Sequence, residues 1–223
     1  MKILALDTSA EYCSIALLID DEVMSQDAYA GQRHSELVLP MVRQVLADSG
    51  IVLAQLDGIA FGSGPGSFTG LRIACGITQG LAFAADLPVT GICTLEALAQ
   101  EAGTEKVVAA LDARMGQIYH AAYEKGLSEW QAVAKPSLCL PLDAPLIEGN
   151  NWTGCGSGFD VYSDVLGVHY ERSIKHVIAG VRPHARSIAQ LAVAKFANGQ
   201  GISAAEAAPL YIRDKVALKE NER

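Results

Sequence analysis

Hydrophobic and polar positions follow two alternating patterns over the first hundred residues. Short apolar runs bounded by turn residues predict buried strands, and apolar residues three and four positions apart predict helices. The predicted order is strands at 3–6, 13–19 and 23–29, a helix at 34–49, a strand at 56–61, a helix at 69–85, a strand at 89–92 and a helix at 94–102. Ser35 and Thr94 are the expected N-caps of the first and third helices, and Gly50 and Gly103 the expected ends.

The second half of the chain repeats this arrangement from about residue 106. Strands are predicted at 107–111 and 118–123, and an irregular stretch over 124–152. A glycine-containing turn at 153–158 then opens a helix around 159–166, and a further helix covers 183–197. Two halves of this kind predict a duplicated α/β fold with two lobes, 1–105 and 106–223, in which the last helix can return to the first lobe.

The segment GSGPGSFTGLR, residues 62–72, lies between a predicted strand and a predicted helix, where many proteins bind phosphate. It lacks the lysine of a P-loop, and Ser67 or Thr69 stands where a dinucleotide fingerprint has its third glycine. Its backbone N–H groups could bind an anion, and Ser67 or Thr69 is a candidate N-cap of the following helix. We favour the alternative, a structural glycine loop without a ligand, formed by Gly62, Gly64, Gly66, Ser67, Thr69 and Gly70.

The composition narrows the classes of function. A formal net charge of -8 argues against a protein that collects free nucleic acid, and we interpret the basic stretch at 169–195 as ordinary solvated surface. Five cysteines without a C-x-x-C pair, together with no signal peptide, predict a reduced, cytoplasmic location. The apolar stretch at 73–92 is interrupted by polar residues and Pro88, so it predicts a buried helix and strand rather than a membrane span.

Four motifs, in order along nearly the whole chain, resemble those of the TsaB family, also called YeaZ. They are ILALDTS at 3–9, the loop at 62–72 with its flanks, LDARMGQIY at 111–119 and PLYIRDKVA at 209–217. The loop is the most specific of the four. The resemblance implies the actin-like ATPase fold of the ASKHA superfamily, with two linked α/β lobes that each hold a mixed sheet flanked by helices.

The resemblance also implies a role in forming N6-threonylcarbamoyladenosine at position 37 of tRNAs that read ANN codons. In bacteria the TsaB family is not the catalyst: it binds a paralogue, TsaD, which carries the active site, and the ATPase TsaE joins them. The implied protein is a cytoplasmic scaffold subunit without a cofactor. It forms a homodimer when alone, contacts tRNA only through the complex and does not bind membranes.

No catalytic centre can be identified among the residues. In TsaD two histidines four positions apart on a helix hold a metal, and an ungapped alignment places those positions at Thr94 and Leu98, which are unsuitable ligands. The absence of a G-x-S-x-G elbow disfavours nucleophilic catalysis by a serine, and the absence of an H-E-x-x-H motif disfavours a metallopeptidase. We interpret residues 33–36 as the entry turn of the first helix, with His34 at the surface. We therefore predict neither a metal nor a catalytic residue.

Two turns match positions that approach the phosphates in ATPases of the resembled fold. Asp7, Thr8 and Ser9 follow the first strand, and Asp112 follows the first strand of the second half. Because no catalytic lysine or glutamate accompanies them, we interpret them as remnants of a nucleotide cleft that binds ATP weakly or not at all. An alternative, a kinase-like protein of the same fold, would turn over ATP by itself. An aspartate in a turn also has a structural role, since it accepts backbone N–H groups two residues on.

The helices at 34–49 and 69–85 carry apolar residues on more than one face, so one face can cover the sheet while another meets a partner. The family uses these helices for its homodimer and for TsaD, although burial of both faces within the monomer is an open alternative. We expect Thr78→Glu to leave the monomer folded and to break both contacts. The expected interface residues are His34, Val38, Met41 and Val42 on the first helix, and Leu71, Arg72, Cys75, Thr78 and Gln79 on the second.

Overall fold

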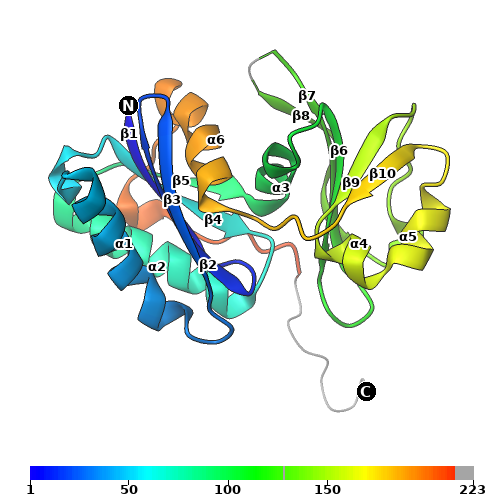
Figure 1. Cartoon of the computed structure of the whole chain (residues 1–223), viewed down its shortest axis with the longest axis horizontal. Coiled ribbons are helices and arrows are strands. Elements are labelled where there is room, and N and C mark those ends of the chain that lie inside the picture. The colour runs from blue at the N-terminus through cyan, green and yellow to red at the C-terminus, as the bar shows by residue number, and fades with distance from the viewer. Residues whose placement is uncertain (128, 214–223) are drawn as a thin grey trace.

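The computed structural model describes residues 1–127 and 129–213, which form two α/β lobes side by side (Figure 1). The first lobe is built on a five-stranded sheet with the strand order β3-β2-β1-β4-β5. The sheet is mixed, because β1 pairs antiparallel with β2 and parallel with β4. Its strands are β1 (Lys2–Asp7), β2 (Tyr12–Ile19), β3 (Glu22–Tyr29), β4 (Gly58–Gly64) and β5 (Val89–Cys93).

The second lobe repeats the topology of the first. Its sheet has the order β10-β9-β6-β7-β8, with β6 antiparallel to β7 and parallel to β9. From β8 to β10 the strands of this sheet follow the same order as those of the first sheet from β3 to β5. The duplicated mixed sheets confirm the predicted two-lobed, actin-like fold. Its strands are β6 (Lys106–Asp112), β7 (Ile118–Lys125), β8 (Trp130–Cys139), β9 (Trp152–Cys155) and β10 (Ile174–Ile178).

Helices cover both faces of the first sheet. One face carries α1 and α2, and the other carries α6, which returns from the second half of the sequence (Figure 1). Within the described residues no helix has both the length and the apolar character needed to cross a bilayer. The helices are α1 (His34–Ser49), α2 (Phe68–Ala85), α3 (Thr94–Ala102), α4 (Ser157–Val161), α5 (Ser163–His169) and α6 (Ala185–Ala197).

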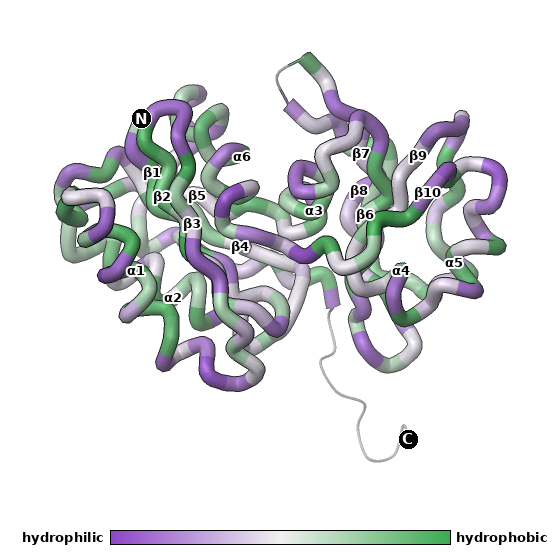
Figure 2. Tube along the Cα trace, in the orientation of Figure 1, coloured by the Kyte–Doolittle hydropathy of each residue, from purple (hydrophilic) through white to green (hydrophobic). Residues whose placement is uncertain are grey.

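The central strand β1 explains why the first sheet is covered on both sides. Its residues alternate between two apolar clusters: Leu4 and Leu6 pack in the cluster that includes α1 and α2, whereas Ile3 and Ala5 pack in the cluster that includes α6. The sequence of a strand that is buried on both faces is a continuous apolar run, and the sequence of β1 has this pattern. Figure 2 shows the resulting pattern, with hydrophobic central strands and hydrophilic outer segments.

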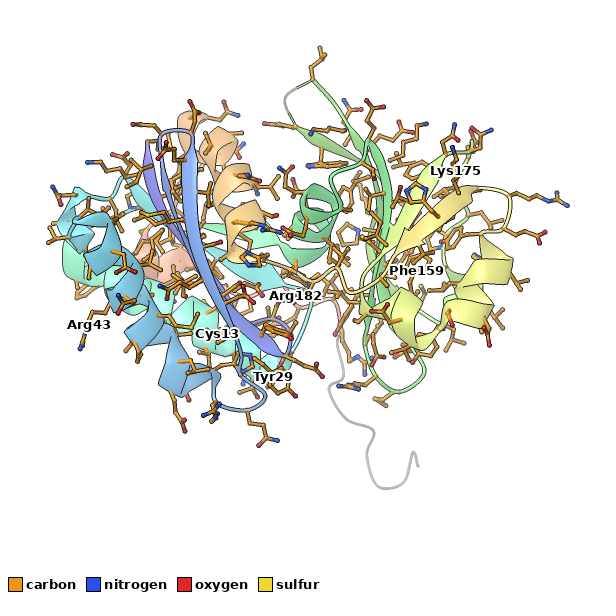
Figure 3. The ribbon with its side chains drawn as sticks, viewed as in Figure 1. Cys13, Tyr29, Arg43, Phe159, Lys175 and Arg182 are labelled. Carbon is orange, nitrogen blue, oxygen red and sulfur yellow. The ribbon has the colours of Figure 1, made fainter. Side chains whose placement is uncertain are left out.

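Arginine side chains attach the segment between β10 and α6 to the first lobe and to α3. Arg182 donates to Asp27 Oδ2 at 2.6 Å, and its guanidinium lies 3.9 Å from the centre of the Tyr12 ring. Arg186 pairs with Glu101 of α3. Figure 3 shows Arg182 between the two lobes. Because these arginines of the basic stretch have carboxylate partners, the stretch does not present them as an open basic face.

Several local predictions require correction. No side chain caps α1, which begins at His34 directly after Arg33, so Ser35 is not its N-cap. Thr94 is likewise not the N-cap of α3: Cys93 holds that position, and the Thr94 hydroxyl donates to the Pro65 carbonyl. The predicted ends of these helices are confirmed, since the glycine after each adopts the left-handed conformation.

Two longer segments in the second lobe also differ from the prediction. Residues 130–139 form the strand β8 rather than an irregular stretch. β8 is an edge strand, so none of its residues is fully buried and it lacks apolar alternation. Pro136 is tolerated because an edge strand has unpaired backbone on one side. The helix predicted around 159–166 is two short helices, α4 and α5, that are broken at Tyr162.

Candidate functional site

The glycine loop packs against the turn that follows β1. The backbone N–H of Ser67 donates to the Ser9 carbonyl at 2.8 Å, and the Thr8 hydroxyl donates to the Gly70 carbonyl at 2.7 Å. The Ser67 hydroxyl accepts from the Gly70 N–H at 3.3 Å, which makes Ser67 the N-cap of α2, in place of the exposed Thr69. The N–H groups of Ser67 and Gly70 are therefore bound within the chain and are not available to an anion.

The same turn explains why the loop needs glycine. A Cβ on Gly66 would lie 2.6 Å from the Ser9 carbonyl oxygen, and a Cβ on Gly70 would overlap the Thr8 carbonyl oxygen. Both obstacles are backbone atoms, which cannot move aside as a flexible side chain can. The glycines of the loop thus permit close packing inside the chain, and this packing accounts for the composition without a phosphate ligand.

We predict that Gly64→Val and Gly66→Val each lower the free energy of unfolding by about 1–3 kcal/mol. Gly64 has a φ of 121° and its Cβ would lie 2.7 Å from the Leu210 carbonyl oxygen, so this site combines strain with overlap, whereas Gly66 has the overlap with Ser9 alone. Urea unfolding measures the loss. The matched control is Gly76→Val on the outer side of α2, where a Cβ meets nothing within 4 Å. Variants that unfold like the wild type but lose nucleotide binding would show that the loop is a phosphate site.

Asp7 is buried directly behind the glycine loop. Its Oδ1 accepts hydrogen bonds from the Ser9 N–H at 3.2 Å and from the Ser9 hydroxyl at 3.0 Å, whereas its Oδ2 is buried beside Gly62 without a partner among the described residues. Burial raises the pKa of this carboxyl from 3.8 to about 7, against the opposing effect of the Ser9 hydrogen bonds. A carboxylate that is 1% exposed is out of reach of a hydrated magnesium ion.

Asp112 occupies the corresponding turn of the second lobe and is also used structurally. Its Oδ1 accepts from the Arg114 N–H at 3.0 Å and from the Tyr162 hydroxyl at 3.3 Å. The Arg114 guanidinium lies 3.3 Å from Asp112 Oδ2. The Asp112 N–H donates to the Ser157 hydroxyl at 3.0 Å. Both predicted cleft aspartates therefore stabilise their own turns.

A segment after α6, residues 204–213, crosses the α2 side of the first lobe, and we call it the C-terminal strap. Gln79 Nε2 donates to the Ala207 carbonyl at 3.0 Å, and Arg72 Nε donates to the Tyr211 hydroxyl at 2.8 Å. Cys75 Sγ also donates to the Ala207 carbonyl, at 3.4 Å, so three of the residues predicted to bind a partner contact the chain's own strap.

The end of the strap joins the two lobes. The Leu210 N–H donates to the Ser63 carbonyl in β4 at 2.7 Å. Three residues further on, the Arg213 guanidinium donates to the Ala113 carbonyl and to Gln117 Oε1, each at 2.9 Å, in the turn between β6 and β7. The strap therefore runs from the glycine loop of one lobe to the Asp112 turn of the other.

Most of the predicted partner residues face the interior of the chain. The imidazole Nε2 of His34 lies 2.9 Å from the Ala10 carbonyl oxygen, so the prediction that His34 lies at the surface is wrong. Thr78 is fully buried, which contradicts the expectation that a charge there leaves the monomer folded. Because these side chains lie on the inner stripes of the helices, they are inaccessible to a partner in this fold. The buried set is His34, Val38, Val42, Leu71, Cys75 and Thr78.

The opposite sides of α1 and α2 form an exposed surface, which we call the helix face. Its apolar members are Leu39 on α1, which is 45% exposed, and Phe83 on α2, which is 85% exposed. At Gly76 and Gly80 a Cβ would meet nothing within 4 Å, so the backbone of α2 is open to close approach. Figure 3 shows Arg43 projecting from α1 away from the sheet. Of the predicted residues, only Met41, Arg72 and Gln79 are at least partly exposed.

The exposed side of α2 has its own spacing in the sequence, distinct from that of the predicted partner residues. Gly76, Gly80 and Phe83 are spaced by four and three residues, which places them on one side of a helix. The residues chosen from the sequence, among them Cys75 and Thr78, belong to the adjacent stripe. Both stripes are rich in small and apolar residues, so periodicity identifies the helix without showing which stripe faces the sheet.

The positions aligned with the metal ligands of TsaD are closed to solvent. Thr94 and Leu98 are both fully buried, and Leu98 packs in an apolar cluster with Leu95 and Cys155. In the described part of the chain, no three histidine, cysteine or acidic residues come together in a way that would hold a metal ion.

Comparisons with known proteins agree with this geometry. The family model described as TsaD, tRNA N6-adenosine threonylcarbamoyltransferase, matches residues 18–220. The chain is 39% identical to the tRNA threonylcarbamoyladenosine biosynthesis protein TsaB of Haemophilus influenzae, over 99% of this chain and 97% of that protein. It is 38% identical to the TsaB of Escherichia coli, over 99% and 98% of the two chains.

A solved structure shows the same fold. YeaZ from Pseudomonas aeruginosa superposes with a TM-score of 0.86 at 38% identity, over 94% of this chain and 99% of that chain. Fold and site together define a two-lobed protein of actin-like fold in which the first glycine loop is filled by the chain's own backbone. The chain belongs to the TsaB family, as its motifs predict. Of the motif at 209–217, residues 214–217 lie outside the described residues.

Proposed function

We propose that this chain is a non-catalytic subunit of the complex that forms N6-threonylcarbamoyladenosine at position 37 of tRNAs reading ANN codons. Its partner is the catalytic paralogue TsaD, joined by the ATPase TsaE. Membership of the TsaB family supports the pathway. The observation that carries the non-catalytic assignment is the mutual packing of the glycine loop and the Asp7 turn, in which the Ser67 N–H is bound to the Ser9 carbonyl and the Gly70 carbonyl to the Thr8 hydroxyl.

The family match alone does not decide between catalyst and accessory subunit, because the matching family model is described as the transferase. The local chemistry favours the accessory role. Buried Thr94 and Leu98 stand where TsaD has its metal ligands, so TsaD itself would supply the reacting groups. The kinase-like alternative has less support, since both candidate aspartates are engaged in their own turns.

We assign the partner contact to the helix face. An apolar centre at Leu39 and Phe83, with Arg43 and Arg72 at its edge, has the composition of a protein interface. The same face would serve the homodimer and the TsaD heterodimer, so the two assemblies would compete. The complex would act in the cytoplasm, and this chain would contact tRNA only through the complex. The net charge of -8 agrees with the lack of direct tRNA binding.

Reconstitution with single omissions tests this function. The chain, TsaD, TsaE, tRNA and the threonylcarbamoyl donor should yield modified adenosine, whereas omitting the chain or TsaD should abolish it. The chain alone should neither modify tRNA nor hydrolyse ATP. Modification by TsaD and TsaE at an unchanged rate without this chain would contradict the proposal, and ATP turnover by the chain alone would favour the kinase-like alternative.

A further inference from the structure

A cavity of about 290 Å³ opens between the lobes, lined by residues that belong to neither the glycine loop nor the helix face. α3 and α6 form one side and the β7–β8 hairpin forms the other, and Figure 1 shows these elements in the upper part of the molecule, between the two sheets. Its volume lies at the lower end of the range of about 300–1,000 Å³ typical of small-molecule sites, so it suits a small ligand. The lining includes Glu96, Gln100, Trp130, Gln190, Leu191 and Lys195.

Charged side chains of both signs line this cavity: Glu96 and Lys195 on the helices, and Lys125 and Glu129 on the β7–β8 hairpin. Glu96 projects from α3 and Lys195 from α6, and no ion pair within 4.0 Å joins either of them to another described residue. The ammonium of Lys195 makes only a 3.4 Å contact with the Gly91 carbonyl oxygen. Burial raises the pKa of Glu96, and Lys195 opposes that shift. A half-buried carboxylate and ammonium held apart leave room for a group that pairs with each.

The remaining wall is fixed and partly apolar. The Trp130 indole N–H donates to Gln100 Oε1, and Gln100 Nε2 donates to Gln190 Oε1, each at 2.9 Å. This chain of hydrogen bonds holds the indole against the cavity, beside Leu191. The Lys125 ammonium lies 5.9 Å from the centre of the Trp130 ring, and the aromatic ring next to the aliphatic Leu191 provides a surface for a small apolar group.

We propose that this cavity binds a free α-amino acid, with its ammonium toward Glu96, its carboxylate toward Lys195 and its side chain against Trp130 and Leu191. A ligand with a single charge would pair with one of the two groups and leave the other uncompensated, which is costly in a partly desolvated site. A zwitterion pairs with both. The carboxylate of Glu129 at the rim adds to the attraction for the ammonium group.

Titration of the full-length chain with L-leucine tests this site, by calorimetry and by indole fluorescence. The chain has two tryptophans, and Trp152 is fully buried, so a fluorescence change reports on Trp130. Leucinamide lacks the carboxylate and N-acetylleucine lacks the ammonium, so each should bind at least about tenfold more weakly than leucine. These two ligands test both charges on the wild-type protein and do not depend on the folding of any variant.

Glu96→Gln and Lys195→Met should each weaken leucine binding by about tenfold or more while leaving the melting temperature nearly unchanged. The matched control is Lys175→Met on β10 of the second lobe, which Figure 3 places far from the cavity and which should bind leucine like the wild type. The proposal is overturned if leucine causes no heat and no fluorescence change up to its solubility limit. It is also overturned if leucinamide binds as tightly as leucine, because the site would then recognise a cation alone.

Discussion

Replacing Phe83 with glutamate should leave the chain folded and reduce its affinity for TsaD by about 100-fold or more. Phe83 is 85% exposed in the monomer, so a polar side chain there costs the isolated fold little. In the proposed interface the same position is central, and the glutamate would have to be desolvated without a partner. Calorimetric titration with TsaD measures the affinity, and sedimentation of the chain alone should show loss of the homodimer.

Two controls make this experiment specific to the helix face. Val168→Glu introduces the same charge at a site 74% exposed on α5 of the second lobe, and it should bind TsaD like the wild type. Thr78→Glu, on the inner stripe of α2, should fail to fold, since an unpaired buried charge costs several kcal/mol of a total stability of about 5–15 kcal/mol. A Phe83→Glu variant that binds TsaD normally would show that the partner contacts another surface.

The hydroxyl of Thr78 offers a further check on the stripe assignment. Thr78 Oγ1 is buried without a hydrogen-bond partner among the described residues. Thr78→Val keeps the shape and removes the unsatisfied group, so we expect the free energy of unfolding to stay constant or to rise by about 1 kcal/mol. A marked loss of stability in urea unfolding would mean that the hydroxyl has a partner.

The second large effect is a pH-dependent gain of stability in Asp7→Asn. The folded-state pKa of Asp7 is raised from 3.8 to about 7, so the folded protein holds a proton that the unfolded chain releases over this window. Wild-type stability therefore falls as the pH rises from about 4 to about 7 and levels off above it. Three pKa units correspond to about 4 kcal/mol, which is an upper estimate of the change.

The Asp7→Asn variant has no ionisable proton at this position, so it lacks the pH dependence that Asp7 causes. Urea unfolding of both proteins at pH 4.5, 6 and 8 should show Asp7→Asn gaining stability relative to the wild type as the pH rises. Other ionisable groups are common to the two proteins and cancel in the difference. A difference that does not change with pH would contradict burial of this carboxyl and would indicate that water or a cation reaches it.

The fold was predictable because its strands and helices have distinct local patterns. The apolar run at 3–6 is fully buried within β1, and the run at 56–61 overlaps β4, which begins at Gly58 after the exposed Asp57. The helical spacing at 34–49 gives α1 with the predicted end at Gly50. β8 could not be predicted in the same way, because an edge strand is stabilised by pairing with β7 and not by its own alternation.

The site was only partly predictable. The sequence identified the glycine loop and favoured a structural role, but it could not show that Thr8 and Ser9 occupy its backbone groups, since these contacts join residues about 60 positions apart. It also could not show that the strap covers one stripe of α2, because hydrogen bonds such as the one from Gln79 to Ala207 depend on tertiary packing. The exposed stripe at Gly76, Gly80 and Phe83 became clear only from burial.

Sedimentation of an equimolar mixture of this chain and TsaD tests the central claim most directly. The account predicts that the wild type and Val168→Glu each exchange their homodimer for a heterodimer with TsaD, whereas Phe83→Glu, which forms no homodimer, sediments separately from TsaD. A mixture in which the two proteins sediment separately, while TsaD and TsaE still modify tRNA at the full rate, would contradict the account.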